Sequence, residues 1–216
     1  MGSTTRVVHS VKLAADPEIA SAVLRLMMAM NDIGVANDAL QEWDTTENPK
    51  KKLRRAGGKL YFGRMQMAHI HEALLIVKEM EQTPSFKRLV ERCDAKTRRS
   101  FDVVVGFLQS KDFKILGDIR NRASFHYDRQ LPLRALNQIA KKYPTDVSTY
   151  SLGHETLDWY FELGDKVADR LVVREIFGVA ENADMRLALD EILGRLHAMA
   201  MAFLDFAGHF IRHYAK

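Results

Sequence analysis

The sequence predicts an all-α protein: a helical bundle with two long heptad-striped helices, N-terminal and C-terminal, and shorter irregular helices between them. Apolar residues recur at alternating steps of four and three, which is the spacing of one helix face. Only 5 prolines and 12 glycines occur in 216 residues, too few for the many turns of an all-β sandwich. The hydrophobic fraction, 47%, is ordinary for a globular domain, and we expect a single domain over residues 1–216.

The first long helix is expected to begin after Asp16, whose side chain suits a helix cap, with Pro17 in the first turn. Residues 1–16 before it are expected to be a flexible segment. The apolar stripe of this helix consists of Ile19, Val23, Leu26, Met30, Ile33 and Leu40. Asn37 takes the stripe position before Leu40 and is a polar interruption of the stripe.

The middle of the chain predicts a second long helix and several short ones. Residues 44–52 are polar and contain Pro49, so they predict a loop. The next helix runs over about residues 53–81, and the pair Gly57-Gly58 makes its first part uncertain. Short helices are expected over residues 85–93, 95–109, 113–122 and from 131 to just before Pro144.

The last part of the chain predicts two more helices after a turn-rich connection. Residues 145–153 form that connection, with room for a short extended piece. Helices are expected over about residues 155–176 and 182–214. The stripe of the last helix is Met185, Leu189, Ile192, Leu196, Met199, Phe203, Phe206 and Phe210. Its spacing predicts coiled-coil-like packing against long partner helices.

The charge distribution and the cysteine count indicate which partners and which cellular compartment to expect. The chain has 32 basic and 28 acidic residues, and three basic clusters lie at residues 50–55, 96–99 and 120–129. We favour solvated surface charge for these clusters over a track for RNA phosphates. The lone Cys93 excludes an internal disulfide and suits a reducing compartment, so we expect a cytoplasmic protein. The apolar stretch at residues 198–206 is too short to span a membrane, and we expect no membrane partner.

Several well-known sites are missing from the sequence. There is no phosphate-binding glycine loop, no G-x-S-x-G elbow and no H-E-x-x-H pair. His209 and His213 share a helix face, but a metal would need a third ligand from elsewhere. Because His213 near a helix end also suits a purely structural role, we expect no metal and no cofactor.

One motif carries chemistry: Ile-Arg-Asn-Arg-Ala-Ser-Phe-His-Tyr at residues 119–127. Arg120 and His126 enclose five residues, and Asn121 follows the arginine. This resembles the signature of the HEPN superfamily, an Arg separated from a His by four to six residues with a polar residue just after the Arg. Arg64 has similar spacings to two other histidines, so Asn121 distinguishes the motif, rather than the spacing.

The resemblance implies a metal-independent endoribonuclease. In that chemistry an RNA 2′-hydroxyl attacks the adjacent phosphate. His126 moves a proton, Arg120 stabilises charge on the phosphate oxygens, and Asn121 orients the histidine or the phosphate. Nearby residues that would contact the RNA are Arg122, Tyr127 and Arg129.

The resemblance also implies a homodimer whose active site is shared, and a role as a toxin or antiviral-defence effector with an antitoxin or defence-complex partner. In an ideal α-helix Arg120 and His126 point about 120° apart. They meet only if the helix kinks or ends there, or if a second protomer supplies one of them. Because many superfamily members are not nucleases, the alternative is a non-enzymatic helical dimerisation module that uses one apolar stripe as an intermolecular seam.

Overall fold

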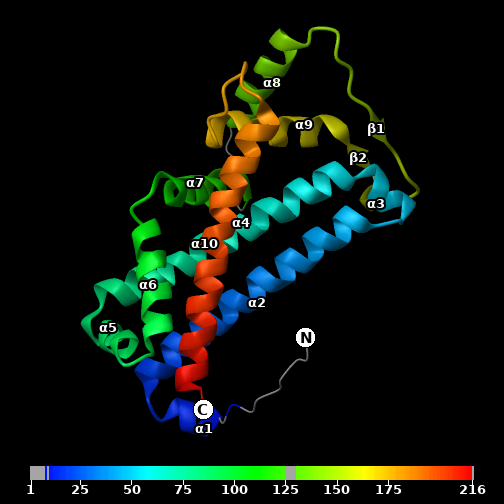
Figure 1. Ribbon diagram of the computed structural model, residues 1–216. Coiled ribbons are helices and arrows are strands. Elements are labelled where there is room, and N and C mark those ends of the chain that lie inside the picture. The colour runs from blue at the N-terminus through cyan, green and yellow to red at the C-terminus, as the bar shows by residue number, and fades with distance from the viewer. Residues whose placement is uncertain (1–7, 9, 125–129, 216) are drawn as a thin grey trace. The chain divides into compact units, whose positions relative to one another are not determined.

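The structure is a computed structural model that describes residues 8, 10–124 and 130–215 (Figure 1). It is almost entirely helical, which confirms the predicted all-α helical bundle. The helices are α1 (Ser10–Ala14), α2 (Pro17–Thr45), α3 (Pro49–Leu53), α4 (Arg55–Gln82), α5 (Pro84–Glu91), α6 (Ala95–Phe107), α7 (Lys111–Ile119), α8 (Leu131–Lys142), α9 (Glu162–Arg170) and α10 (Met185–Tyr214). Strands β1 (Tyr150–Ser151) and β2 (Tyr160–Phe161) pair antiparallel.

Helix starts follow the expected capping chemistry. The Asp16 carboxylate accepts hydrogen bonds from the backbone N–H groups of Glu18 and Ile19, both at 3.1 Å, and Pro17 opens α2. At α6, the carboxylate of Asp94 accepts the backbone N–H of Thr97 at 2.7 Å. These caps place the ends of the helices close to the predicted positions.

Three predicted segments differ from the structure. Residues 10–14, inside the segment 1–16 expected to be flexible, form α1. The loop expected over residues 44–52 is confirmed only at residues 46–48, because α2 continues to Thr45 and Pro49 opens α3, a position in which proline costs a helix little. The expected helix over residues 155–176 is wrong in its first part. A 3₁₀ turn (Thr156–Asp158) and β2 come first, and α9 starts only at Glu162. The extended piece expected within residues 145–153 is β1.

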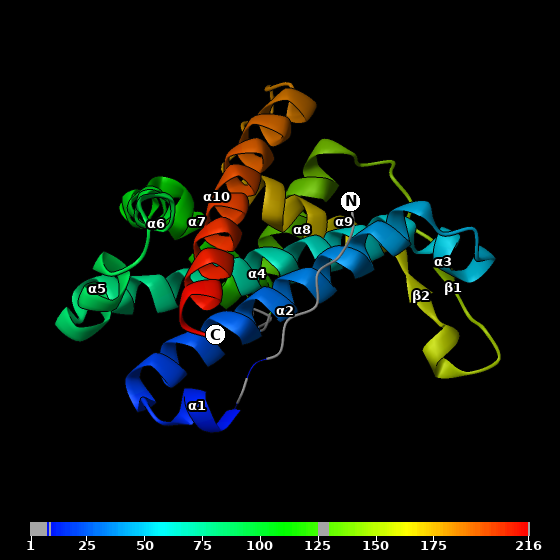
Figure 2. The ribbon, with the colours of Figure 1, turned by 60° about the horizontal axis from the view of Figure 1, so that its bottom comes forward.

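The chain divides into two compact units, and the prediction of one domain over residues 1–216 stays a prediction. Unit 1 consists of Met1–Ile33, His69–Phe113 and Arg195–Lys216; unit 2 consists of Gly34–Ala68 and Lys114–Gly194. The helices α2, α4 and α10 contribute segments to both. Within each unit α2 and α4 lie side by side (Figure 2). An ion pair joins them in unit 1 (Arg25–Glu79, 2.7 Å) and another in unit 2 (Asp44–Lys59, 2.6 Å).

The core of unit 1 forms around the C-terminal half of α10. Phe203, Phe206 and Phe210 are fully buried, and the ring centroid of Phe206 lies 5.1 Å from that of Phe101 on α6. Val23 on the predicted stripe of α2 is also fully buried. These buried parts of both stripes therefore pack within the chain, so they cannot form an intermolecular seam.

By length and composition, α2 is apolar enough to cross a membrane, and 28% of its most apolar window is buried. This segment differs from residues 198–206, the apolar stretch singled out from the sequence. In unit 1 the Arg25 guanidinium on α2 donates two hydrogen bonds to the Glu79 carboxylate, at 2.9 and 2.7 Å. Val23 and Leu26 are fully covered by protein. These side chains of α2 therefore pack within unit 1.

Candidate functional site

The described part of the motif lies where α7 changes its winding. The α-helix ends at Ile119, and residues Arg120–Ser124 form a π-helical turn, η1. Ile119 and Ala123 are buried in the core of unit 2, whereas Arg120 is partly exposed and Asn121 is exposed. Turns of this kind are rare and occur frequently at functional sites. One condition for bringing the motif residues together, a departure from the ideal α-helix, is therefore fulfilled.

Hydrogen bonds within η1 and to α4 hold this turn in place. The Arg120 guanidinium donates to the Asn121 side-chain carbonyl at 2.8 Å, which joins the first two residues of the motif. From α4, the Arg64 guanidinium donates to the backbone carbonyl of Ala123 at 2.7 Å. The Ser124 hydroxyl in turn donates to the carbonyl of Arg64 at 3.1 Å. The segment of α4 around Arg64 thus holds the turn that presents Arg120.

The other predicted site residues divide into two groups. Arg122 lies in η1, with its guanidinium 3.8 Å from the Asp118 carboxylate. His126, Tyr127 and Arg129 lie outside the described residues. The approach of His126 to Arg120 therefore stays a prediction.

The described residues contain no group of three or more His, Cys, Asp or Glu side chains that could hold a metal ion. His209 and His213 thus lack a third ligand within that part of the chain. Cys93 is buried, and burial raises the pKa of its thiol to about 11, which keeps it protonated at neutral pH. Nucleophilic chemistry at this cysteine is therefore disfavoured.

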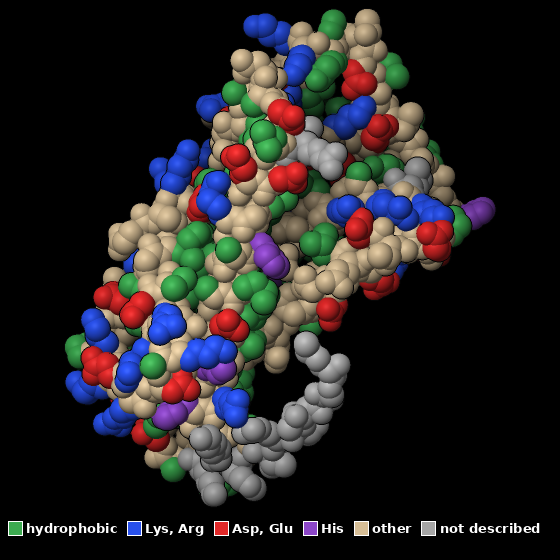
Figure 3. Space-filling model, in the orientation of Figure 1, with side chains coloured by type: hydrophobic (Ala, Val, Ile, Leu, Met, Phe, Trp, Pro, Cys, Tyr) green, Lys and Arg blue, Asp and Glu red, His purple; other side chains and the backbone are tan. Residues whose placement is uncertain are grey.

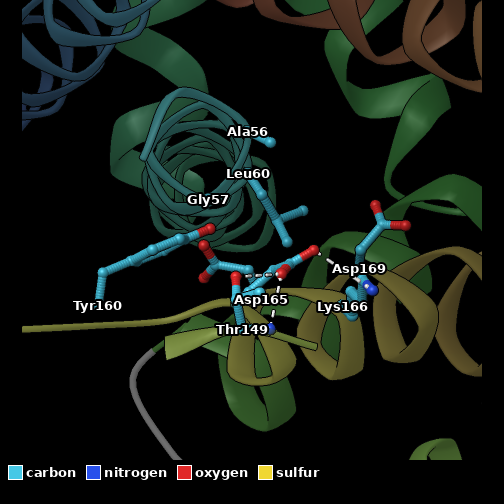
Figure 4. Close-up of a pocket in the computed structure, with 9 residues that line it drawn as sticks. Ala56, Gly57, Leu60, Thr149, Tyr160, Asp165, Lys166 and Asp169 are labelled. Carbon is cyan, nitrogen blue, oxygen red and sulfur yellow. Dashed lines mark hydrogen bonds and ion pairs between the residues drawn. The ribbon is translucent and has the colours of Figure 1, made fainter. Parts of the chain in front are cut away.

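A cavity of about 500 Å³ lies in unit 2 between the start of α4 and α9 (Figure 4). Its walls are Ala56, Gly57, Leu60, Thr149, Tyr160, Glu162, Asp165, Lys166 and Asp169. The Asp165 carboxylate approaches the backbone of α4 so closely that a Cβ atom on Gly57 would lie 1.8 Å from it. Gly57 is thus a packing position, which explains why a glycine is tolerated inside α4.

The polar groups of this cavity bind one another. The Glu162 carboxylate accepts the backbone N–H of Thr149 at 2.9 Å and its hydroxyl at 2.8 Å, and the Lys166 ammonium lies 3.3 Å away. These contacts lower the pKa of Glu162 to about 2. Burial, and a hydrogen bond to Asp165, raise the pKa of Tyr160 to about 12. Because these groups join the β-hairpin to α9, we assign the cavity a bracing role.

An open groove of about 460 Å³ lies in unit 2 where β2 meets α2 and α4. Its aromatic lining consists of Trp43, Tyr61, Phe62, Trp159, Tyr160 and Phe161. Arg54, Gly57, Gly58 and Asp165 complete the lining, and we name this site the aromatic groove. No sequence motif predicts this groove, since its residues come from three distant segments. The available signal was the position of Tyr61-Phe62 just after the basic run at residues 50–55.

Comparisons of this chain with protein-family models, curated proteins and solved structures found no match. The resemblance to the HEPN superfamily therefore depends on residues 119–127, together with an all-α fold. Any function assigned to this chain therefore depends on the chemistry of the site itself.

Proposed function

We propose that this protein is a HEPN-like, metal-independent endoribonuclease with Arg120, Asn121 and His126 as its catalytic residues. One observation carries the proposal: the Arg120 side chain is hydrogen-bonded to that of Asn121 on a π-helical turn that Arg64 anchors from α4. A guanidinium held in this way is preorganised to bind a phosphate, because little side-chain freedom remains to be lost on binding.

The proposed reaction needs only groups of the protein and the RNA. The 2′-oxygen forms a bond to the adjacent phosphorus, and the bond from phosphorus to the 5′-oxygen breaks. The proton of the 2′-hydroxyl leaves to a base, and the 5′-oxygen gains a proton. His126 performs one of these transfers, because its ordinary pKa lies near neutrality. Arg120 stabilises the negative charge that develops on the phosphate oxygens.

The same proposal gives the protein a cytoplasmic setting and a homodimeric assembly in which two motifs face one cleft. Arg122, Tyr127 and Arg129 would contact the RNA beside the cleavage site. A toxin or antiviral-defence role, with an antitoxin or defence-complex partner, is part of what the resemblance implies. These statements depend on the motif and are tested with it.

The test is cleavage of a labelled RNA by the purified chain in excess EDTA. We expect cleavage to persist in EDTA and to fall roughly 100-fold or more in Arg120→Ala and in His126→Ala. Arg134→Ala, at an exposed position on α8, is the matched control and should cleave normally. Circular dichroism must show that all variants are folded. Cleavage that survives in both motif variants would remove the assignment.

A second candidate, a non-enzymatic dimerisation module, is favoured by apolar side chains on the surface of unit 1. Leu24 and Met28 are one turn apart on α2 and are 49% and 65% exposed. Met28 lines an open groove together with Leu75 of α4, which is 37% exposed. Exposed apolar groups that share a face often mark an association surface. Dimerisation without RNA cleavage would distinguish this candidate from the nuclease.

A further inference from the structure

The aromatic groove is built by close packing of distant segments. The ring centroid of Trp43, near the end of α2, lies 6.2 Å from that of Phe62 on α4, and Tyr61 packs edge-on against Phe62 at 5.0 Å. A Cβ atom on Gly58 would lie 2.3 Å from the Trp43 indole. Glycine is therefore what lets the indole lie against the backbone of α4. The groove floor is consequently a fixed part of unit 2.

The rim of the groove leaves aromatic faces open to solvent. Trp159 is 40% exposed, Phe161 is 56% exposed and Tyr61 is 45% exposed. Three partly exposed rings around one groove offer flat apolar faces on which a planar ligand can stack.

Cations lie against two other rings of the groove, Trp43 and Tyr160. The Lys51 ammonium is 5.6 Å from the ring centroid of Trp43, and the Arg54 guanidinium is 5.9 Å from that of Tyr160. Arg54 also donates to the backbone carbonyl of Trp159 at 2.7 Å, which ties the basic segment to the hairpin. Figure 3 shows a row of Lys and Arg side chains over α3.

The segment that carries Lys51 and Arg54 has more basic than acidic side chains. Residues 42–59 contain six basic and three acidic side chains. Lys51 and Lys52 pair with Glu42 and Glu47, and both acids are well exposed. Exposed pairs of this kind contribute little to stability, so phosphate groups can replace the carboxylates at low cost.

The groove combines aromatic rings with cations, and this combination favours one class of ligand. A quaternary ammonium in an aromatic cage is disfavoured, because the positive charges of Lys51 and Arg54 beside Trp43 and Tyr160 would repel it. Double-stranded RNA is disfavoured as well, because its bases are stacked inside the helix and cannot reach the rings. Single-stranded RNA offers both unpaired bases for the rings and phosphates for the cations.

The groove also adjoins the segment of α4 that holds the motif. Tyr61 and Arg64 lie on the same face of α4, about 4.5 Å apart along the helix axis. Arg64 binds the backbone of η1, the turn that carries Arg120. The groove and η1 therefore both contact the segment of α4 over residues 57–64, within unit 2.

We propose that the aromatic groove binds single-stranded RNA, with bases stacked on Trp159, Phe161 and Tyr61 and phosphates held by Lys51 and Arg54. This inference depends on the proposed function for the identity of the polynucleotide. The contacts themselves require no cleavage, so binding and catalysis can be tested separately.

The test measures fluorescence anisotropy of a labelled oligouridylate of about 12 nucleotides, in a His126→Ala background so that the RNA stays intact. We expect Trp159→Ala and Phe161→Ala each to weaken binding roughly 5- to 100-fold, and Trp159→Phe to restore most of the loss. Tyr143→Ala is the matched control. Tyr143 is also in unit 2, is 49% exposed and has the Lys142 ammonium 5.3 Å from its ring, but it lies outside the groove.

A second arm tests the cations. The slope of log affinity against log salt should fall by about 0.7 in Lys51→Gln, as expected for the loss of one phosphate contact to a single strand. A duplex RNA of the same length should bind more weakly than the single strand. Equal affinity for the duplex would contradict stacking in the groove.

The outcomes separate this inference from the proposed nuclease. Unchanged affinity in folded Trp159→Ala and Phe161→Ala, equal weakening in Tyr143→Ala, or no binding by the parent chain would overturn the groove. Cleavage that depends on Arg120 could still stand in that case. If RNA binds through the groove but is never cleaved, the groove stands and the nuclease assignment falls.

Discussion

At the scale of single residues, the two adjacent glycines near the start of α4 show how distant contacts fix a local choice. In the sequence, Gly57-Gly58 only made the beginning of a helix uncertain. In the structure both lie inside α4, where Asp165 approaches Gly57 and Trp43 approaches Gly58. No local pattern predicts these contacts, because the partners lie 108 and 15 residues away. Periodicity predicted the helix, but it could not explain its glycines.

The glycine contact gives a stability prediction. Alanine is the better helix former, but a Cβ atom at position 58 would lie 2.3 Å from the Trp43 ring. We expect Gly58→Ala to lower the free energy of unfolding by roughly 1–3 kcal/mol. Gly63→Ala in the same helix is the matched control. Its Cβ would meet nothing within 4 Å, and the change should stabilise by about 0.5–1 kcal/mol.

Urea unfolding of the two variants measures this difference. If both substitutions stabilise the protein equally, Trp43 does not pack against Gly58 as described. The aromatic groove would then lose its fixed floor.

At the scale of elements, the hairpin and α9 show where the periodicity of the sequence predicted a helix in place of a strand. Residues 155–161 fit a helix that continues into α9, yet Tyr160 and Phe161 adopt a strand that pairs with Ser151 and Tyr150. Aromatic residues suit strands, and a partner strand outweighs a weak local helix preference. The π-helical turn at residues 120–124 was equally beyond prediction, because it depends on Arg64 from α4.

The same hairpin gives a pH prediction. The contacts from Thr149 and Lys166 hold the pKa of Glu162 near 2, below its ordinary 4.5. The folded state therefore binds this proton less readily than the unfolded state. The resulting stabilisation is fully present above the ordinary pKa and is lost as the pH falls through about 2.

We therefore expect Glu162→Gln to have a lower free energy of unfolding than the parent at neutral pH. This difference in unfolding free energy, called the gap below, should shrink as the pH falls from 4.5 toward about 2. Unfolding followed by circular dichroism over this range measures the gap. Glu155→Gln, at an exposed position before the hairpin strand, controls for the loss of a charge. A gap that stays constant with pH would show that Glu162 does not act through its ionised carboxylate.

At the scale of the whole molecule, the fold class was predictable and the assembly was not. Long apolar stripes identified helices, and their buried parts, such as Leu26 and Phe206, form the core within the chain. Spacing alone could not assign a stripe to core or to interface, because both use the same period. The apolar side chains left exposed, Leu24 and Met28, lie outside the predicted stripe of α2.

The assembly prediction concerns both candidate functions. We expect light scattering on the purified chain to give a dimer, since the shared-cleft nuclease and the dimerisation module both require one. Met28→Lys should dissociate it if the exposed face of α2 is the contact, and Val103→Lys, at an exposed position on α6, is the matched control. A monomer at all concentrations would contradict both forms of assembly.

In the proposed nuclease, Arg120 and His126 cleave RNA through attack by the neighbouring 2′-hydroxyl. The most direct measurement is the chemical identity of the new RNA ends made by the purified chain in EDTA. This mechanism predicts a 2′,3′-cyclic phosphate on one fragment and a 5′-hydroxyl on the other, with neither formed by Arg120→Ala. Fragments that end in a 3′-hydroxyl would contradict it.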